Sequence, residues 1–203
     1  MGEPSFEPSH VRAARRVSEA SIAWTLLAST LAIAIGLASG SSALVAFGLV
    51  GYVDLAGSVA LVHHFRHALR TDALSDRFER RAHRIVTFGL LVIGLAAIVV
   101  SAIRLASGHR PSTSDAGIGI AAASLVVLGV LAVLKVRIGK RVPSAALRSD
   151  GHLSGIGAAQ AAVVLLGAEA TDLLSWTWAD DAAAIVVGAV AVAIAVSTIA
   201  RER

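Results

Sequence analysis

A few ionisable side chains lie inside long apolar runs of this chain, and they are the residues whose chemistry stands out. Asp54 is the clearest, because it lies midway along GLVGYVDLAGSVALVHHF with apolar or small residues on both sides. A charged side chain at the centre of a membrane helix costs at least about 2.5 to 3.5 kcal/mol, so it normally faces the bundle interior and serves a function. We therefore expect Asp54 to lie on an ion path. The alternative is that it pairs with a hydroxyl of another helix and only fixes packing.

Asp150 and His152 are the next candidates, in the run ALRSDGHLSGIGAAQAAVVLL. Carboxylate and imidazole are the ligand types expected for zinc and similar divalent ions. At about 100° per residue the two side chains point about 200° apart on a helix, so we expect at most one of them to bind a given ion. Asp150 shares its face with Ser154 and Gly157, and its alternative role is helix capping or pairing with Arg148.

Three histidines, His63, His64 and His67, follow Asp54 at the end of its apolar run, in VHHFRH. His63 and His67 are one helical turn apart, but partly solvated histidines at a membrane surface are ordinary. An interfacial surface is therefore one interpretation. Metal entry or proton transfer, with His64 as a displaced ligand or proton carrier, is the other.

Asp180 and Asp181 begin the last apolar run, in SWTWADDAAAIVV. Carboxylates are favoured at the start of a helix, so we expect a helix cap and outer-surface charge here rather than a site. Trp176 and Trp178, just before them, fit an aromatic belt at a membrane surface.

The composition assigns these residues to a membrane protein. The chain has 203 residues, of which 56% are hydrophobic and only 16% charged, which is outside the usual range for soluble proteins. It has no cysteine, which excludes disulfides, zinc fingers, iron–sulfur clusters and thiol nucleophiles. An enzyme is not expected, because no nucleophile, phosphate-binding loop or paired acid and base appears. No permanently bound cofactor is expected either.

Six segments are long and apolar enough to cross a bilayer, which takes roughly 20 residues. They run from Ile22 to Ala38, Ala43 to Phe65, Ile85 to Ala106, Ala116 to Val136, Ser144 to Ala168, and Trp178 to Ala200. The apolar spacing between the second and third segments predicts that both helices continue beyond the membrane. The expected fold is an all-α membrane protein, a six-transmembrane-helix bundle over 21–203. Residues 1–20 form a short N-terminal segment, and no C-terminal cytoplasmic domain is expected.

The basic residues predict the orientation of this bundle. Sixteen of the eighteen Lys and Arg residues fall on the side that carries both termini, and basic residues accumulate on the cytoplasmic side. We therefore expect both termini to be cytoplasmic and the charge to serve topology rather than nucleic-acid binding. Arg outnumbers Lys sixteen to two in a chain rich in Ala, Gly and Val, which favours a bacterial plasma membrane.

This combination of features resembles the transmembrane domain of the cation diffusion facilitator family, over roughly Ala23 to Ala200. The resemblance is carried by the acid in the second span, by LRSDGH opening the fifth and by WADDAAAIVVGAVAV opening the sixth. It implies export of zinc or a related divalent cation, usually against protons, through ligands from the second and fifth helices. Asp54, Asp150, His152 and His64 are the expected metal residues, and a homodimer is expected.

The four ligand positions of the family fall at Val50, Asp54, Leu153 and Gly157, so only Asp54 keeps a metal-binding side chain. Two hypotheses follow. In the first, the chain is a divergent cation transporter that uses Asp54 and Asp150, which requires the second and fifth helices to face each other. In the second, it is a structural or regulatory membrane subunit that has kept the fold and lost the metal site.

Overall fold

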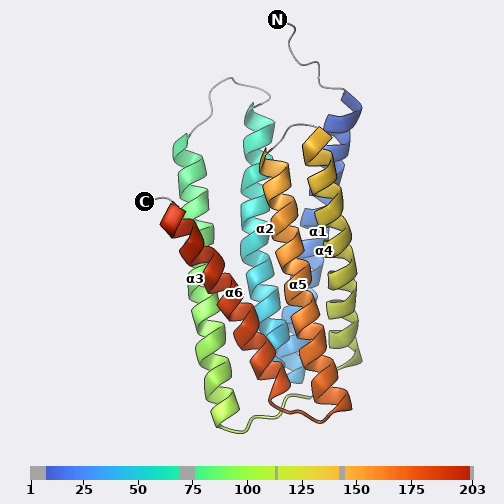
Figure 1. Ribbon diagram of the computed structural model, residues 1–203, viewed down its shortest axis with the longest axis vertical. Helices are drawn as coiled ribbons and strands as arrows, with labels where there is room; N and C mark the ends of the chain where they lie inside the picture. The colour runs from blue at the N-terminus through green and yellow to red at the C-terminus, as the bar shows by residue number, and fades with distance from the viewer. Residues whose placement is uncertain (1–7, 69–75, 113, 142–144, 202–203) are drawn as a thin grey trace, which may run out of the picture.

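The computed structural model describes residues 8–68, 76–112, 114–141 and 145–201, and in this part of the chain the regular secondary structure is all helical, without strands (Figure 1). Six helices follow one another along the chain: α1 (Pro8–Ser39), α2 (Ser42–Ala68), α3 (Asp76–Ala106), α4 (Asp115–Arg141), α5 (Ala145–Leu173) and α6 (Ala179–Arg201). The predicted all-α fold is confirmed.

Five of the six helices contain stretches long and apolar enough to cross a membrane. These stretches are Ala13–Ser39, Val86–Ala106, Asp115–Arg141, Asp150–Leu173 and Ala179–Ala200. Helix α2 contributes a shorter apolar stretch, Ser42–Ala56, among the described residues. The five stretches indicate an integral membrane protein, and the crossing by α2 stays a prediction.

The side chains are distributed as lipid solvation requires. Large apolar residues face outward, among them Phe88 and Leu166, which are 68% and 69% exposed. The buried positions hold mainly small residues, because Ala, Ser and Gly let helices approach closely where there is no hydrophobic driving force between them. Gly94 of α3 and Gly188 of α6 show this at one crossing, where a Cβ on either would come within 2.7 Å of the other's carbonyl oxygen.

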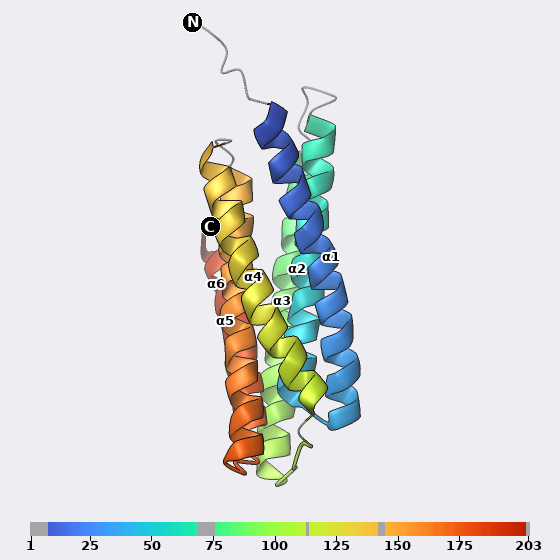
Figure 2. The same ribbon diagram turned by 90° about the vertical axis from the view of Figure 1, so that its right-hand side faces the viewer.

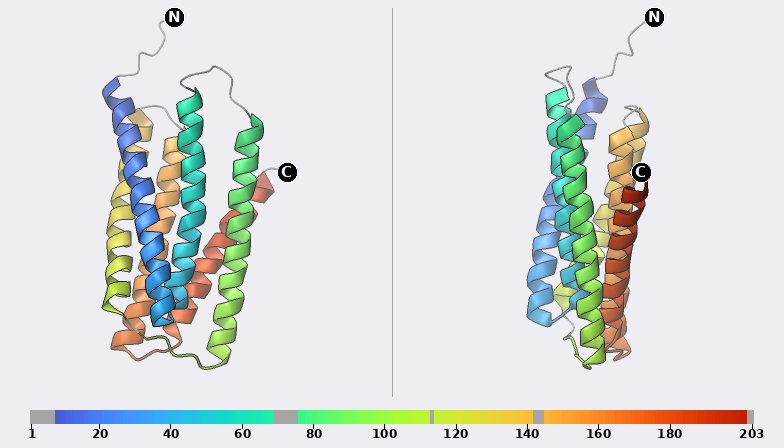
Figure 3. Two further views of the ribbon diagram at one scale, coloured as in Figure 1. Left: turned by 180° about the vertical axis from the view of Figure 1, so that it is seen from behind. Right: turned by 90° about the vertical axis from the view of Figure 1, so that its left-hand side faces the viewer.

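Consecutive helices run in opposite directions, so α1 begins and α6 ends toward the same end of the bundle (Figures 1 and 2). We call this the terminus end. The opposite end, called the far end, carries the connections at Gly40, Gly108 and Ser175, the three described residues with positive φ. Helices α1, α2, α4 and α5 form a four-helix group, and α3 and α6 pack as a pair against α2, with α6 also contacting α5 (Figure 3).

The helices extend further than the apolar runs that predict them. Helix α1 begins at Pro8 rather than near Ile22, because polar residues continue the helix outside the apolar run. Arg15 donates to Glu19 at 2.7 Å, a pair one turn apart that supports such an extension. The predicted continuation of the second and third helices is confirmed, since α2 reaches Ala68 and α3 starts at Asp76.

Candidate functional site

Lys135 of α4 is the largest fully buried side chain among the described residues, at 1% exposure. Its Nζ lies 2.8 Å from Oδ2 of Asp150 and donates to the hydroxyls of Ser21 and Ser154 at 2.7 and 2.9 Å. An ammonium has three N–H donors, and all three are used here. The buried charge is therefore both paired and hydrogen-bonded, which is the condition under which a protein interior tolerates one.

Asp150 of α5 extends this arrangement to α2. While its Oδ2 pairs with Lys135, its Oδ1 accepts a hydrogen bond of 3.2 Å from Ser58. Arg148, the alternative partner considered for Asp150, donates instead to the carbonyl of Gly139 in α4. We call Ser21, Ser58, Lys135, Asp150 and Ser154 the buried lysine cluster. It ties together α1, α2, α4 and α5, the whole four-helix group.

The helix contacts that place the buried lysine cluster depend on Gly151. Asp150 and Ser154 are one turn apart on α5, so both reach the same side of the helix. Beside them a Cβ on Gly151 would come within 2.8 Å of Val136 Cγ2 and 3.0 Å of Lys135 Cβ. The absence of a side chain at Gly151 therefore lets α4 and α5 approach closely enough for the ion pair to form.

Asp54 lies one turn from Ser58 on α2 and is partly buried. The charges of Asp150 and Lys135 both act on its carboxylate. Among the described residues, no hydrogen-bond donor or ion-pair partner contacts this carboxylate, so the alternative role of pairing with a hydroxyl is not seen. Within the described residues, the site is thus a carboxylate without a polar contact beside an ion pair whose donors are all used. Helices α2 and α5 contact each other here, as the first hypothesis requires.

The other predicted metal residues do not join Asp54 and Asp150 in the described part of the chain. His152 is exposed on the opposite side of α5 from the cluster, as the helical spacing predicts. The side chains of His63, His64 and His67 lie outside the described residues. Within the ranges that the structure describes, no group of three or more His, Asp or Glu could hold a metal ion.

No protein-family model matches the chain, and no curated protein matches it.

The positions that correspond to the metal ligands of the resembling family lie on α2 and α5. Val50 is buried on the same side of α2 as Asp54, whereas Leu153 is 39% exposed on α5. A Cβ on Gly157 would meet Leu128 of α4 at 3.3 Å, so this position faces α4. The polar side chains that α5 directs into the bundle are those of Asp150 and Ser154. They do not coincide with the family positions, Leu153 and Gly157.

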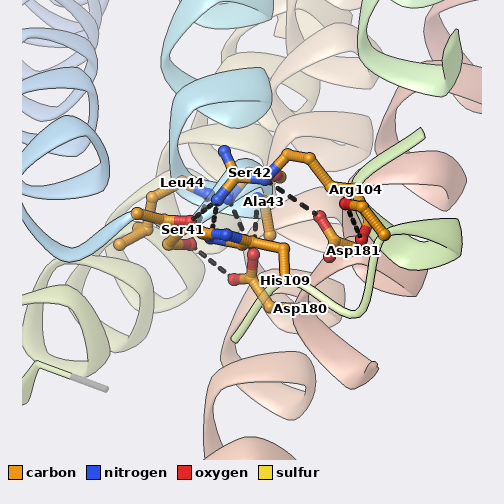
Figure 4. A network of polar contacts seen from close by, with 10 residues as sticks. Ser41, Ser42, Ala43, Leu44, Arg104, His109, Asp180 and Asp181 are labelled. Atoms are coloured by element: carbon orange, nitrogen blue, oxygen red, sulfur yellow. Dashed lines mark hydrogen bonds and ion pairs between the residues drawn. The ribbon is translucent and has the colours of Figure 1, made fainter. Parts of the chain in front are cut away.

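A second polar group lies at the far end, around Asp180 of α6 (Figure 4). The Asp180 carboxylate accepts hydrogen bonds from the Ser41 hydroxyl at 2.5 Å and from the backbone N–H groups of Ser42 and Ala43 at 2.7 and 3.3 Å. These are free donors of the first turn of α2, where a negative charge is favourable. Asp180 therefore caps α2, not its own helix.

Asp181, the next residue, faces α3. Its Oδ1 lies 3.8 Å from Nε of Arg104, whose guanidinium also donates to the Gly40 carbonyl and contacts Nε2 of His109 (Figure 4). Asp180 and Asp181 are 3% and 1% exposed, so the prediction of outer-surface charge is wrong. The reason is that the connection preceding α6 brings its first turn against the α1–α2 turn, where Asp180 accepts hydrogen bonds. Asp181 lies near Arg104, and neither of its oxygens accepts a hydrogen bond from a described residue.

Lys135 is the residue of the candidate site that sequence reasoning missed, because the charge count groups it with the basic residues that set topology. A signal for it is present in the sequence. The buried face of α4 recurs every three or four residues, at Ser124, Leu128, Leu131, Lys135 and Gly139. A lysine that continues a buried helical stripe is predicted to point into the bundle.

Proposed function

We propose that this protein is a divalent metal cation transporter of the cation diffusion facilitator type, with Asp54 on the ion path. The single observation that carries the proposal is the Asp54 carboxylate, which has no polar partner among the described residues although it lies within an apolar bundle. A protein that used this residue only for packing would give it a partner, since a buried polar group without one is costly.

The position of Asp54 suits alternating access. Helix α2 contacts α1, α3, α5 and α6, so a movement of the α3–α6 pair against the four-helix group would change the surroundings of Asp54. Rocking of one group of helices around a fixed site is how many transporters expose that site to either side in turn. A proton would compete with the metal for the carboxylate, which couples the two ions.

The proposal includes six spans with cytoplasmic termini, in the plasma membrane of a bacterium, with zinc as the first ion to test. Its support is the charge asymmetry of the sequence together with the antiparallel order of the helices. Carboxylate oxygens bind Zn²⁺ and Co²⁺ but suit the harder Mn²⁺ better, so all three ions are compared by experiment.

The test is a titration of the purified full chain in detergent with Zn²⁺, Mn²⁺ and Co²⁺. We expect saturable binding that is lost in Asp54→Ala and retained in Asp115→Ala, because Asp115 is an exposed acid in the first turn of α4. Asp54→Ala should unfold at about the temperature of the wild type, since no partner is removed. Binding that is absent, or that survives Asp54→Ala, would refute the transporter.

A second candidate function is a structural or regulatory membrane subunit that does not transport. The observation that favours it is that Lys135 and Asp150 bind each other, with every Lys135 donor used. Asp54 is then the only acid of the site that has no polar contact among the described residues. Uptake of metal into vesicles that contain the purified protein separates the two candidates. A subunit of this kind would fold and insert normally but would move no ion.

A further inference from the structure

The Lys135 ammonium pairs with Asp150, a carboxylate that a bound metal cation would also use. It lies 2.8 Å from Asp150 Oδ2, and Ser58 donates to the other oxygen, Oδ1. A carboxylate oxygen that binds zinc lies about 2.0 to 2.2 Å from it, so a metal on Oδ2 of Asp150 would lie close to the Lys135 ammonium and be repelled by it. The Asp54 carboxylate, by contrast, has no polar contact with another described residue.

We propose that Lys135 is a tethered competitor of the transported cation. Its ammonium holds Asp150 until the metal arrives, moves off Asp150 when the metal binds, and returns to it when the metal leaves. This inference rests on the proposed function, because it assigns to Lys135 the control of affinity at the site that contains Asp54.

The charges of the site make the competition necessary. A divalent ion that entered the site would be attracted by the two carboxylates and repelled by the ammonium beside Asp150. The repulsion between the two cations is strong where the dielectric constant is low. A metal therefore binds Asp54 and Asp150 together only at the cost of moving Lys135 away.

The other two contacts of Lys135 indicate which groups can hold its ammonium after it leaves Asp150. Ser21 on α1 and Ser154 on α5 accept hydrogen bonds from it independently of Asp150. Lysine has a flexible four-carbon stem, so the ammonium can give up one partner and keep the other two. The two hydroxyls thus form a resting place that keeps the displaced charge hydrogen-bonded.

A competing ammonium weakens metal binding, which favours release and transport of the ion over its tight retention. An ion path must bind its ion well enough to admit it and weakly enough to release it. Two free carboxylates inside an apolar bundle would hold a divalent ion tightly. An ammonium fixed beside them supplies the opposing force and needs no second ligand to do so.

The experiment measures the affinity of the full chain for Mn²⁺ and Zn²⁺ by equilibrium dialysis in detergent. We expect Lys135→Gln to bind both ions about tenfold more tightly or better, because removing the like charge leaves Asp150 open. Lys135→Arg keeps the charge and should not bind more tightly. Lys140→Gln is the matched control, since Lys140 is the only other lysine and is exposed on the same helix.

A second variant tests the resting place without removing the ion pair. In Ser21→Ala/Ser154→Ala the displaced ammonium has no hydroxyl to accept its N–H groups, so binding of both ions should weaken several-fold. Unchanged affinity in this variant would overturn the inference. So would a Lys135→Gln protein that folds, judged by its thermal unfolding, and binds no more tightly than the wild type.

These outcomes separate the inference from the proposed function. If the wild type binds no metal and Lys135→Gln gains binding that depends on Asp54, the competitor is supported and the transporter is refuted. If the wild type binds metal through Asp54 and Lys135→Gln binds equally well, the transporter stands and the competitor is refuted.

Discussion

At the scale of single residues, the cost of burying Lys135 explains most of what surrounds it. A charge in an apolar interior is tolerated when it is paired and when its remaining donors are bonded, and Asp150, Ser21 and Ser154 meet that condition. The pair does not by itself imply stability, since two charges lose their hydration to form it. What it does imply is that neither partner can be removed alone without leaving the other uncompensated.

This leads to a prediction about the pair as a unit. Lys135→Met should lower the free energy of unfolding by about 3 to 5 kcal/mol, because it leaves a buried carboxylate without its partner. The double variant Lys135→Met/Asp150→Asn should recover most of that loss. Chemical unfolding in detergent micelles measures both. A double variant that loses as much as the two single variants together would show that the residues do not depend on each other.

Part of this site could be predicted from the sequence. Asp54 and Asp150 could be found because an acid inside an apolar run is costly and is therefore rare without a role. Lys135 is grouped with the topology-setting residues, because a count of charges does not separate a lysine at a membrane surface from one that points inward, and only its place in the helical stripe of α4 distinguishes it. The partners of Asp150 could not be predicted, since they depend on which helices are neighbours in space.

At the scale of the helices, small residues decide how near two elements come and hence which polar groups meet. Gly151 and Gly155 lie four residues apart on α5, at the GxxxG spacing that can permit close helix contact, but their surroundings differ. Gly151 lies against the backbone of α4, whereas a Cβ on Gly155 would have Ala132 as its nearest neighbour, at 3.8 Å. One glycine of the motif is therefore required by packing and the other is not.

We therefore predict opposite effects for the same substitution at the two positions. Gly151→Ala forces α4 and α5 apart and should destabilise the protein by about 1 to 3 kcal/mol, as overpacking does. Gly155→Ala adds a methyl group at ordinary contact distance and should be neutral or stabilise by up to about 1 kcal/mol, because alanine favours the helix. Thermal unfolding of the two variants side by side is the measurement. Equal losses would contradict this account of the α4–α5 contact.

Helix ends were harder to predict than helix interiors. Apolar runs mark where a helix is buried in lipid and not where it stops, which is why α1 reaches Pro8. The role of Asp180 illustrates the same difficulty. A carboxylate in a first turn is ordinarily assigned to its own helix, and the sequence does not reveal that the α1–α2 turn lies beside it.

The cap that Asp180 provides gives a second prediction at this scale. Asp180→Ala leaves the buried N–H groups of Ser42 and Ala43 without an acceptor, so it should cost about 1.5 to 3 kcal/mol of unfolding free energy. Asp115→Ala, which removes an exposed acid from the first turn of α4, should cost at most about 1 kcal/mol. Hydrogen exchange of the first turn of α2 should rise in Asp180→Ala alone. Protection unchanged in that turn would contradict the cap.

At the scale of the whole molecule, polar contacts hold α2 near both sides of Asp54. The Asp180 carboxylate holds its first turn at the far end, and Ser58 joins the buried lysine cluster. These two contacts are about 24 Å apart at about 1.5 Å of rise per residue. Asp54 lies between them, two residues from Tyr52, whose hydroxyl is hydrogen-bonded to Thr30 of α1 at 2.7 Å. An ion that binds Asp54 would therefore act on the helix that touches both the four-helix group and the α3–α6 pair.

The number of membrane crossings is the prediction that decides this arrangement. If α1, α2 and α3 all cross, Arg16 and Arg84 lie on the cytoplasmic side and Ser107 on the other; if α2 does not cross, Arg84 moves to the side opposite Arg16. All three residues are exposed, and the chain has no cysteine, so single-cysteine variants carry one label each.

We expect an impermeant maleimide added to intact cells to label Ser107→Cys and to leave Arg16→Cys and Arg84→Cys unlabelled until the membrane is opened. The basic residues gathered at the terminus end are the physical reason, since they resist transfer across the membrane. Labelling of Arg84→Cys in intact cells would mean that α2 does not cross. Asp54 would then lie outside the bilayer centre, and the reason for its having no partner would be solvation rather than ion binding.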